Sequence, residues 1–156
     1  MTLPFSTEEE MVKVFLYNSK LDIKYKYLDW NMWETIEMEG LFGIPDVVMA
    51  FGKVSISGQK IIRTYAFELK LRNWKRALVQ AFRYSAFSHY SIVVLDDANI
   101  QPALSNLAMF QRSNIGLLTL DRQGHITWYN EPKYQEPYSS QLYKTLSSNL
   151  SQKLFN

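Results

Sequence analysis

The chain has 156 residues, of which 47% are hydrophobic and 15% aromatic, so it can form one compact domain over residues 1–156 with a substantial core. It contains no cysteine, which excludes disulfides, thiolate zinc sites and cysteine nucleophiles. The formal net charge of +2 is too small to indicate a partner by itself.

The N-terminus lacks the basic start and the apolar run of a signal peptide, and the chain has no apolar run of about 18 residues. Together with the lack of cysteine, this predicts a soluble, cytoplasmic protein with no membrane partner.

The first third of the chain gives two clear patterns and one ambiguous segment. A helix is predicted over residues 7–18, because Ser6 or Thr7 can cap it and the acids of residues 8–10 suit the positive end of its dipole. Residues 21–28 alternate apolar and charged side chains, which predicts a strand with one wet face. Residues 29–43 are rich in Trp, Met and Glu and are typical of a loop or a short helix.

The middle of the chain predicts a hairpin followed by a helix. Strands are expected over residues 46–51 and 61–71, with turn signals between them. Asn73 can cap a helix from Trp74 to about Phe87. Its predicted apolar face carries Trp74, Ala77, Leu78, Ala81 and Ser85, and its opposite face carries Arg76, Gln80, Arg83 and Tyr84.

The last part of the chain predicts three more strands and two helices. Residues 90–95 read as a central strand buried on both faces, followed by a helix around residues 99–110. Strands at 115–120 and 125–129 flank a turn, and a polar connection at 130–141 precedes a closing helix with leucines at 142, 146, 150 and 154. The order α-β-ββ-α-β-α-β-β-α predicts an α/β sandwich.

Charge is segregated along the chain. Residues 1–52 hold nine acids and four bases, a net charge of −5, whereas residues 53–83 hold eight bases and one acid, Glu68, a net charge of +7. A lone carboxylate within a basic segment indicates a polyanion held beside a cation site. The alternative, an ordinary solvated basic face, stays open.

Three charged residues carry the candidate chemistry. Glu68 and Lys70 are two residues apart on the second hairpin strand and therefore share a face, while Asp46 begins the partner strand. Two neighbouring carboxylates repel, so this arrangement predicts a site for a hard divalent cation, with the carbonyl of Leu69 as a further ligand. Mg²⁺ is the expected ion. It can polarise a phosphate and activate a water, and Lys70 can position that water or offset negative charge.

These residues resemble the motifs of the PD-(D/E)XK nuclease superfamily, which includes restriction endonucleases, archaeal Holliday-junction resolvases and RecB-type nuclease domains. The resemblance runs from the first helix to about Leu95. Pro45-Asp46 and Glu68-Leu69-Lys70 match the two defining motifs, and Gly43-Ile44-Pro45-Asp46 fits the G-x-x-D form. Gln80-Ala81-Phe82-Arg83-Tyr84 resembles the Q-x-x-x-Y helix motif, an independent third match.

The resemblance implies a restriction-endonuclease-like three-layer sandwich, with a central mixed sheet flanked by helices. It implies Mg²⁺-dependent cleavage of double-stranded or branched DNA, with Mn²⁺ as a substitute ion and Gln80 and Tyr84 assisting at the active site. An N-terminal glutamate also joins the metal site in this family, and the register favours Glu8; the alternative that Glu8, Glu9 and Glu10 only serve the helix dipole stays open. A homodimer is compatible with cutting both strands.

The basic residues that follow the second motif are candidates for nucleic-acid contacts. They are Arg72, Lys75, Arg76 and Arg83. The four tryptophans are expected to pack in the core rather than stack on bases. His89 and His125 lie far apart without a partner at ligand spacing, so no zinc site is predicted.

The same residues also permit other interpretations. The charged cluster could be a salt-bridged strand surface, and Gln80 and Tyr84 could lie on a solvated helix face. A glycoside hydrolase is excluded, because Lys70 would hold Glu68 ionised rather than as a proton donor. A nuclease-like module without turnover, which binds nucleic acid or protein, remains the alternative function, and RNA remains an alternative substrate.

Overall fold

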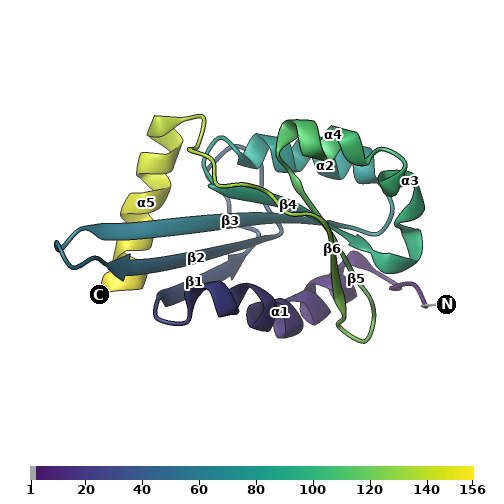
Figure 1. Ribbon diagram of the computed structural model, residues 1–156, viewed down its shortest axis with the longest axis horizontal. Coiled ribbons are helices and arrows are strands. Elements are labelled where there is room, and N and C mark those ends of the chain that lie inside the picture. Colours follow the sequence, from purple (N-terminus) through teal and green to yellow (C-terminus); the bar gives the residue numbers. More distant parts are fainter. Residues whose placement is uncertain (1–2) are drawn as a thin grey trace.

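The computed structural model describes residues 3–156, and these form an α/β fold around one six-stranded mixed sheet (Figure 1). The strands lie in chain order: β1 (Asn31–Ile36), β2 (Val47–Val54), β3 (Lys60–Lys70), β4 (Tyr90–Asp96), β5 (Gly116–Leu120) and β6 (Ile126–Asn130). β1, β2 and β3 pair antiparallel, β3, β4 and β5 pair parallel, and β6 returns antiparallel to β5. The sheet is therefore open, with β1 and β6 at its edges.

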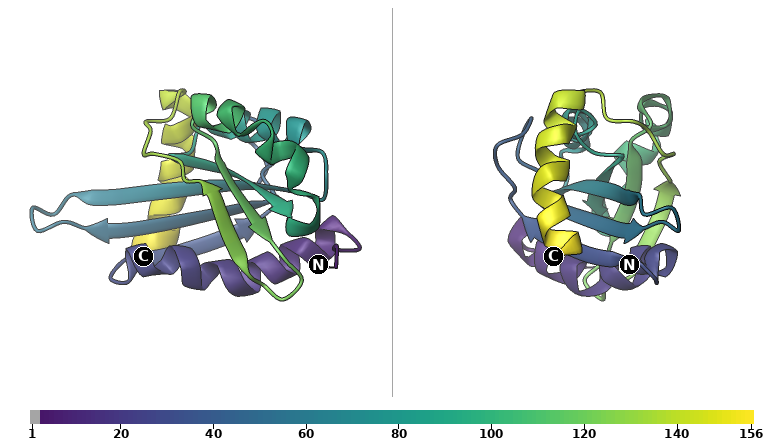
Figure 2. Two further views of the ribbon diagram at one scale, coloured as in Figure 1. Left: turned by 45° about the vertical axis from the view of Figure 1, so that its right-hand side comes forward. Right: turned by 90° about the vertical axis from the view of Figure 1, so that its left-hand side faces the viewer.

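Helices cover both faces of the sheet (Figures 1 and 2). They are α1 (Glu8–Lys24), α2 (Trp74–Tyr84), α3 (Gln101–Leu104), α4 (Leu107–Ser113) and α5 (Ser140–Phe155). Alternate residues of β3 separate the faces: Phe67 packs with α1, whereas Ala66 packs in the cluster that holds the leucines of α5. None of the helices within residues 3–156 is long and apolar enough to cross a membrane.

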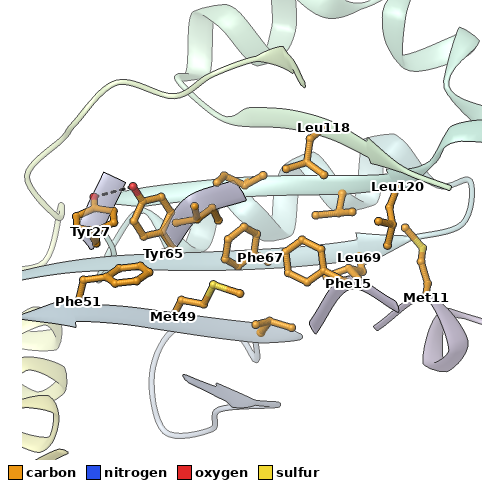
Figure 3. Close-up of a cluster of buried hydrophobic side chains, with 14 of the residues drawn as sticks. Met11, Phe15, Tyr27, Met49, Phe51, Tyr65, Phe67, Leu69, Leu118 and Leu120 are labelled. Atoms are coloured by element: carbon orange, nitrogen blue, oxygen red, sulfur yellow. Dashed lines mark hydrogen bonds between the residues drawn. The ribbon is translucent and has the colours of Figure 1, made fainter. Parts of the chain in front are cut away.

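The largest core lies between α1 and the sheet (Figure 3). Phe15 of α1 meets Phe67 of β3 edge to face, with ring centroids 4.9 Å apart. Tyr27, in the 3-10 turn η1 (Tyr25–Tyr27), stacks on Phe51 at 4.2 Å, and its hydroxyl hydrogen-bonds that of Tyr65 at 2.7 Å. This core fixes the N-terminus of α1 beside the end of β3.

The prediction of a strand at residues 21–28 is wrong. α1 continues to Lys24 and η1 follows, so the first helix is longer than the predicted 7–18. Met11, Phe15, Ile23 and Tyr27 are buried at multiples of four residues, whereas Tyr25 is 73% exposed. The apparent alternation is therefore one side of a helix whose other side is charged.

The first strand lies instead at Asn31–Ile36. This is part of the segment 29–43, for which the sequence predicted a loop or a short helix. β1 is an edge strand whose residues are exposed or only half-buried, so it lacks a clear apolar alternation. Residues 131–139 form the expected connection between β6 and α5.

The other predicted elements are confirmed with small shifts at their ends. The hairpin of β2 and β3, the buried central strand β4, and the closing helix α5 with Leu146, Leu150 and Leu154 buried are all present. The single helix predicted at residues 99–110 is divided into a 3-10 turn η2 (Asp97–Asn99), α3 and α4.

Candidate active site

Asp46 and Glu68 lie opposite each other where β2 begins and β3 ends. Val47 pairs with Phe67, and the Asp46 N–H donates to the Phe67 carbonyl at 3.0 Å, which continues the ladder to the next pair. The Leu69 N–H then donates to Asp46 Oδ2 at 2.8 Å. The predicted convergence of the two carboxylates is therefore present.

The site disfavours two negative charges. Burial raises the pKa of Glu68 to about 6, and the charge of Asp46 acts in the same direction. Burial also raises the pKa of Asp46, against the opposing effects of the Leu69 N–H and the Lys70 ammonium. A pair of poorly solvated carboxylates of this kind is relieved by a nearby cation.

Lys70 supplies one such cation on the predicted face. Its Nζ lies 3.3 Å from Glu68 Oε2 and 3.9 Å from Glu8 Oε1. The Lys70 side chain is only 19% exposed, so these interactions are weakly screened by water. Lys70 therefore bridges the second motif and the first turn of α1.

The structure distinguishes among the three N-terminal glutamates. Glu8 reaches the site, where its Oε2 accepts the Leu71 N–H at 3.2 Å in addition to the contact with Lys70. Glu9 instead pairs with Lys13 at 3.6 Å, and Glu10 pairs with Arg122 at 3.1 Å. Glu8 is thus the one that the geometry brings to Lys70.

The prediction that Tyr84 lies on the outward, polar face of α2 is wrong. Tyr84 is 1% exposed, and its hydroxyl donates to Glu68 Oε1 at 2.5 Å and lies 3.0 Å from the Ile44 carbonyl. The reason is helical spacing, since Tyr84 follows the buried Ala77 and Ala81 by seven and three residues. Tyr84 therefore contacts the second motif directly.

Gly43 makes room for the Tyr84 ring. A Cβ at Gly43 would lie 2.9 Å from Tyr84 Cε1, and the φ of Gly43 is +84°, in the region that favours glycine. The glycine of Gly43-Ile44-Pro45-Asp46 thus has a packing role and a backbone role, both of which hold the segment before Asp46 against α2.

Gln80 lies one helical turn before Tyr84, but it does not share the hydrogen bond of Tyr84 to Glu68. Its Oε1 is buried and has no hydrogen-bond partner among residues 3–156, which leaves an acceptor for an incoming donor. Gln80 also lines a hollow of about 490 Å³ together with Asn73, Lys75, Arg76, Val79 and Arg83. Three of the predicted nucleic-acid contacts therefore gather at one hollow, while Arg72 lies exposed outside its lining.

Glu37 is a residue of this site that the sequence analysis missed. It follows β1 with a φ of +48°, its N–H donates to the Asp46 carbonyl at 3.1 Å, and its charge adds to the raised pKa of Asp46. Its position could have been found only with β1 correctly placed.

The donor set fits a hard cation that keeps several waters. Among residues 3–156, no group of three or more His, Cys, Asp or Glu side chains could hold a metal ion, so Asp46 and Glu68 are the two side-chain candidates. Successive strand residues direct their backbone groups to alternate sides, and the Leu69 N–H points to Asp46, so the Leu69 carbonyl faces the same side. Two carboxylates and one carbonyl are oxygen ligands of the type that Mg²⁺ uses.

Comparison of the chain with protein-family models, curated protein sequences and solved structures found no match. The function of this chain is therefore inferred from the geometry of this site and from its motifs.

Proposed function

We propose that this chain is a Mg²⁺-dependent nuclease that hydrolyses phosphodiester bonds of DNA. The observation that carries the proposal is the meeting of Asp46, Glu68 and Lys70 at adjacent strand ends, with Tyr84 hydrogen-bonded to Glu68. A six-stranded mixed sheet with helices on both faces supports a restriction-endonuclease-like three-layer sandwich of the PD-(D/E)XK type.

Each residue has a chemical role in this proposal. Asp46, Glu68 and the Leu69 carbonyl would hold Mg²⁺, or Mn²⁺ in its place. When bound, the ion would supply polarisation of the phosphate and a lower pKa for a water. Lys70 orients the attacking water and offsets the charge that develops on the phosphate. Tyr84 orients Glu68, and Glu8 holds Lys70. Gln80 offers its buried amide oxygen as an acceptor.

The proposed substrate is double-stranded or branched DNA, cut in restriction, repair or recombination in the cytoplasm. Arg72, Lys75, Arg76 and Arg83 would contact its backbone, since arginine and lysine are the usual phosphate ligands. A homodimer would supply a second centre for cutting both strands.

Cleavage assays with Mg²⁺ or Mn²⁺ test the proposal. Linear, circular and branched DNA and an RNA of the same sequence are incubated with the wild type, Lys70→Ala and Lys144→Ala. Lys144 is exposed in α5, so its loss controls for the removal of one positive charge. We expect DNA cleavage that Lys70→Ala slows by about 100-fold or more, as when one electrostatic donor is removed, and that Lys144→Ala leaves unchanged. Failure to cut any DNA, or equal rates for Lys70→Ala and wild type, contradicts the proposal.

The second candidate is a nuclease-like module that binds nucleic acid or protein without turnover. Both oxygens of the Glu68 carboxylate already have a partner in the protein, which favours this candidate. Oε1 accepts a hydrogen bond from Tyr84, and Oε2 forms an ion pair with Lys70. Calorimetric titration with Mn²⁺ separates the two candidates. Binding that Asp46→Asn abolishes supports the nuclease, whereas no binding to the wild type supports the silent module.

A further inference from the structure

A groove runs along the outer side of α2, where two hollows meet. The first, of about 490 Å³, is the basic hollow lined by Gln80. The second, of about 610 Å³, lies between α2, α4 and the segment before β2, and its lining residues are Phe42, Leu78, Val79, Phe82, Arg83, Met109, Arg112 and Ser113. Val79 and Arg83 line both hollows, so the two adjoin. We call this surface the α2 groove.

The lining of the α2 groove carries positive charge without any acid. Its cations are Lys75, Arg76, Arg83 and Arg112, from two helices. Arg76, Val79, Gln80 and Arg83 follow one another at helical spacing and therefore form one stripe on α2. The complementary occupant is an anion that extends along this stripe.

The same groove exposes flat apolar side chains. Phe42 is 50% and Phe82 45% exposed, and Val79 and Met109 lie exposed beside them. The Arg83 guanidinium lies over the Phe42 ring at 5.6 Å, and the ring of the exposed Tyr138 lies 5.8 Å from that of Phe82. Rings that alternate with arginines provide surfaces on which nucleic-acid bases stack.

These two features favour single-stranded over double-stranded nucleic acid. The bases of a duplex are stacked on each other, so its outer surface offers phosphates to the arginines but no base face to Phe42 or Phe82. A single strand offers both, because each nucleotide carries a phosphate and an accessible base.

Residues of the α2 groove are close neighbours in the chain of residues in the candidate active site. Arg83 precedes Tyr84, whose hydroxyl donates to Glu68. On the other wall, Phe42 lies two residues before Ile44, whose carbonyl is 3.0 Å from the same hydroxyl. A strand bound in the groove would therefore approach Glu68 from the side of α2.

We propose that the α2 groove binds a single-stranded segment of DNA, with Arg76, Arg83 and Arg112 on phosphates and Phe42 and Phe82 on bases. The binding of single-stranded DNA in the α2 groove does not depend on the proposed nuclease function. The delivery of that DNA to Glu68 rests on the proposed nuclease function. The substrate class is then DNA with a single-stranded region, such as a flap, a gap or a branch point.

Fluorescence anisotropy in EDTA tests the binding without cleavage. The probes are a labelled 16-nucleotide oligodeoxythymidine and a labelled mixed-sequence duplex of 16 base pairs. We expect the single strand to bind at least about tenfold more tightly than the duplex. Phe82→Ala and Arg112→Ala should each weaken single-strand binding by about fivefold to tenfold, and Phe82→Leu should weaken it similarly because leucine cannot stack.

Two variants serve as matched controls. Tyr17→Ala removes a tyrosine that is 82% exposed on α1, across the sheet, and Lys144→Ala removes an exposed charge on α5. Both should bind the single strand as the wild type does. Phe82 and Arg112 are exposed, so we expect both alanine variants to fold; circular dichroism and thermal melting check this.

The outcomes separate this proposal from the nuclease. Single-strand binding that Phe82→Ala and Arg112→Ala weaken supports the groove even if no DNA is cut. Equal binding by these variants and the wild type overturns the groove even if duplex DNA is cut, and so does tighter binding of the duplex. Binding of a glutamate-rich amphipathic peptide in place of the oligonucleotide also overturns it, because the groove is then a peptide site.

Discussion

The Tyr84 hydroxyl joins three parts of the chain at one point. It belongs to α2, it donates to Glu68 at the end of β3, and it lies against the Ile44 carbonyl in the segment that leads to Asp46. A hydrogen bond to a buried carboxylate is stronger than one between neutral groups. This hydroxyl therefore helps to hold Glu68 in place and favours its charged form, against the larger effect of burial, which raises the pKa of Glu68.

We expect Tyr84→Phe to lower the free energy of unfolding by about 1.5–3 kcal/mol, because it removes a hydrogen bond to a charged group and leaves the carboxylate buried. Urea unfolding at pH 7 measures this. Tyr17→Phe, at an exposed site, should change stability by less than about 0.5 kcal/mol. Equal stability of Tyr84→Phe and wild type would show that the hydroxyl does not support Glu68.

The sequence predicted the charged residues of the site better than the tyrosine. Asp46, Glu68 and Lys70 follow from the period of two along paired strands, which is independent of what packs around them. The sequence prediction places Tyr84 on the polar face of the helix together with Gln80 and Arg83. Its spacing from Ala77 and Ala81 places it on the apolar face, where small side chains leave room for a ring. Spacing was thus the better guide.

At the level of the elements, contacts between distant parts of the chain determine where α1 ends and where β1 forms. Residues 21–24 alternate as a strand would, yet they remain helical because Ile23 packs on the sheet together with Met11 and Phe15. β1 forms at Asn31–Ile36 because β2 offers it a free edge, with Trp33 opposite Ala50. An edge strand is defined by its partner more than by its own pattern, so Glu37 could not be located from sequence.

His89 connects β3 to the start of β4. The Thr64 N–H donates to His89 Nδ1 at 3.0 Å, and the His89 N–H donates to Thr64 Oγ1 at 3.1 Å. The imidazole also stacks on Tyr134, in the connection before α5, at 5.2 Å. Burial lowers the pKa of His89 to about 4, and the charge of Arg63 acts in the same direction while Glu136 opposes it. The structure therefore holds this histidine neutral.

We expect acid to weaken these contacts at a predictable pH. The pKa of His89 is lower in the folded chain than the ordinary 6.5 of the unfolded chain, so stability is complete above 6.5 and is lost as pH falls toward 4. Between pH 7 and pH 5 this group should cost the wild type about 2 kcal/mol of unfolding free energy. Urea unfolding of the wild type and His89→Gln at both pH values measures the difference, which cancels the carboxylates common to both. An equal loss in the two proteins would contradict the role of His89.

At the scale of the whole molecule, the charge segregation along the sequence becomes a segregation in space. A hollow of about 460 Å³ on one side of the centre is lined by Glu8, Glu9 and Glu37, together with Asp46. The α2 groove, with its four cations, lies on the side of Gln80 and Arg83. A polyanion is repelled by the first surface and attracted by the second, which favours its approach to the candidate active site from the side of α2.

The salt dependence of single-strand binding should report the number of phosphate contacts in the α2 groove. Each phosphate neutralised on a single strand contributes about 0.7 to the slope of log Kd against log salt, so the three arginines placed on phosphates predict a slope of about 2. Arg112→Ala should lower that slope by about 0.7, whereas Phe82→Ala should weaken binding at every salt concentration without changing the slope, because stacking releases no counterions. Anisotropy titrations of the 16-nucleotide probe in EDTA, between about 50 and 200 mM NaCl, measure both quantities. If Arg112→Ala kept the wild-type slope, Arg112 would not contact a phosphate, and if Phe82→Ala reduced the slope, its ring would act by placing a cation rather than by stacking on a base.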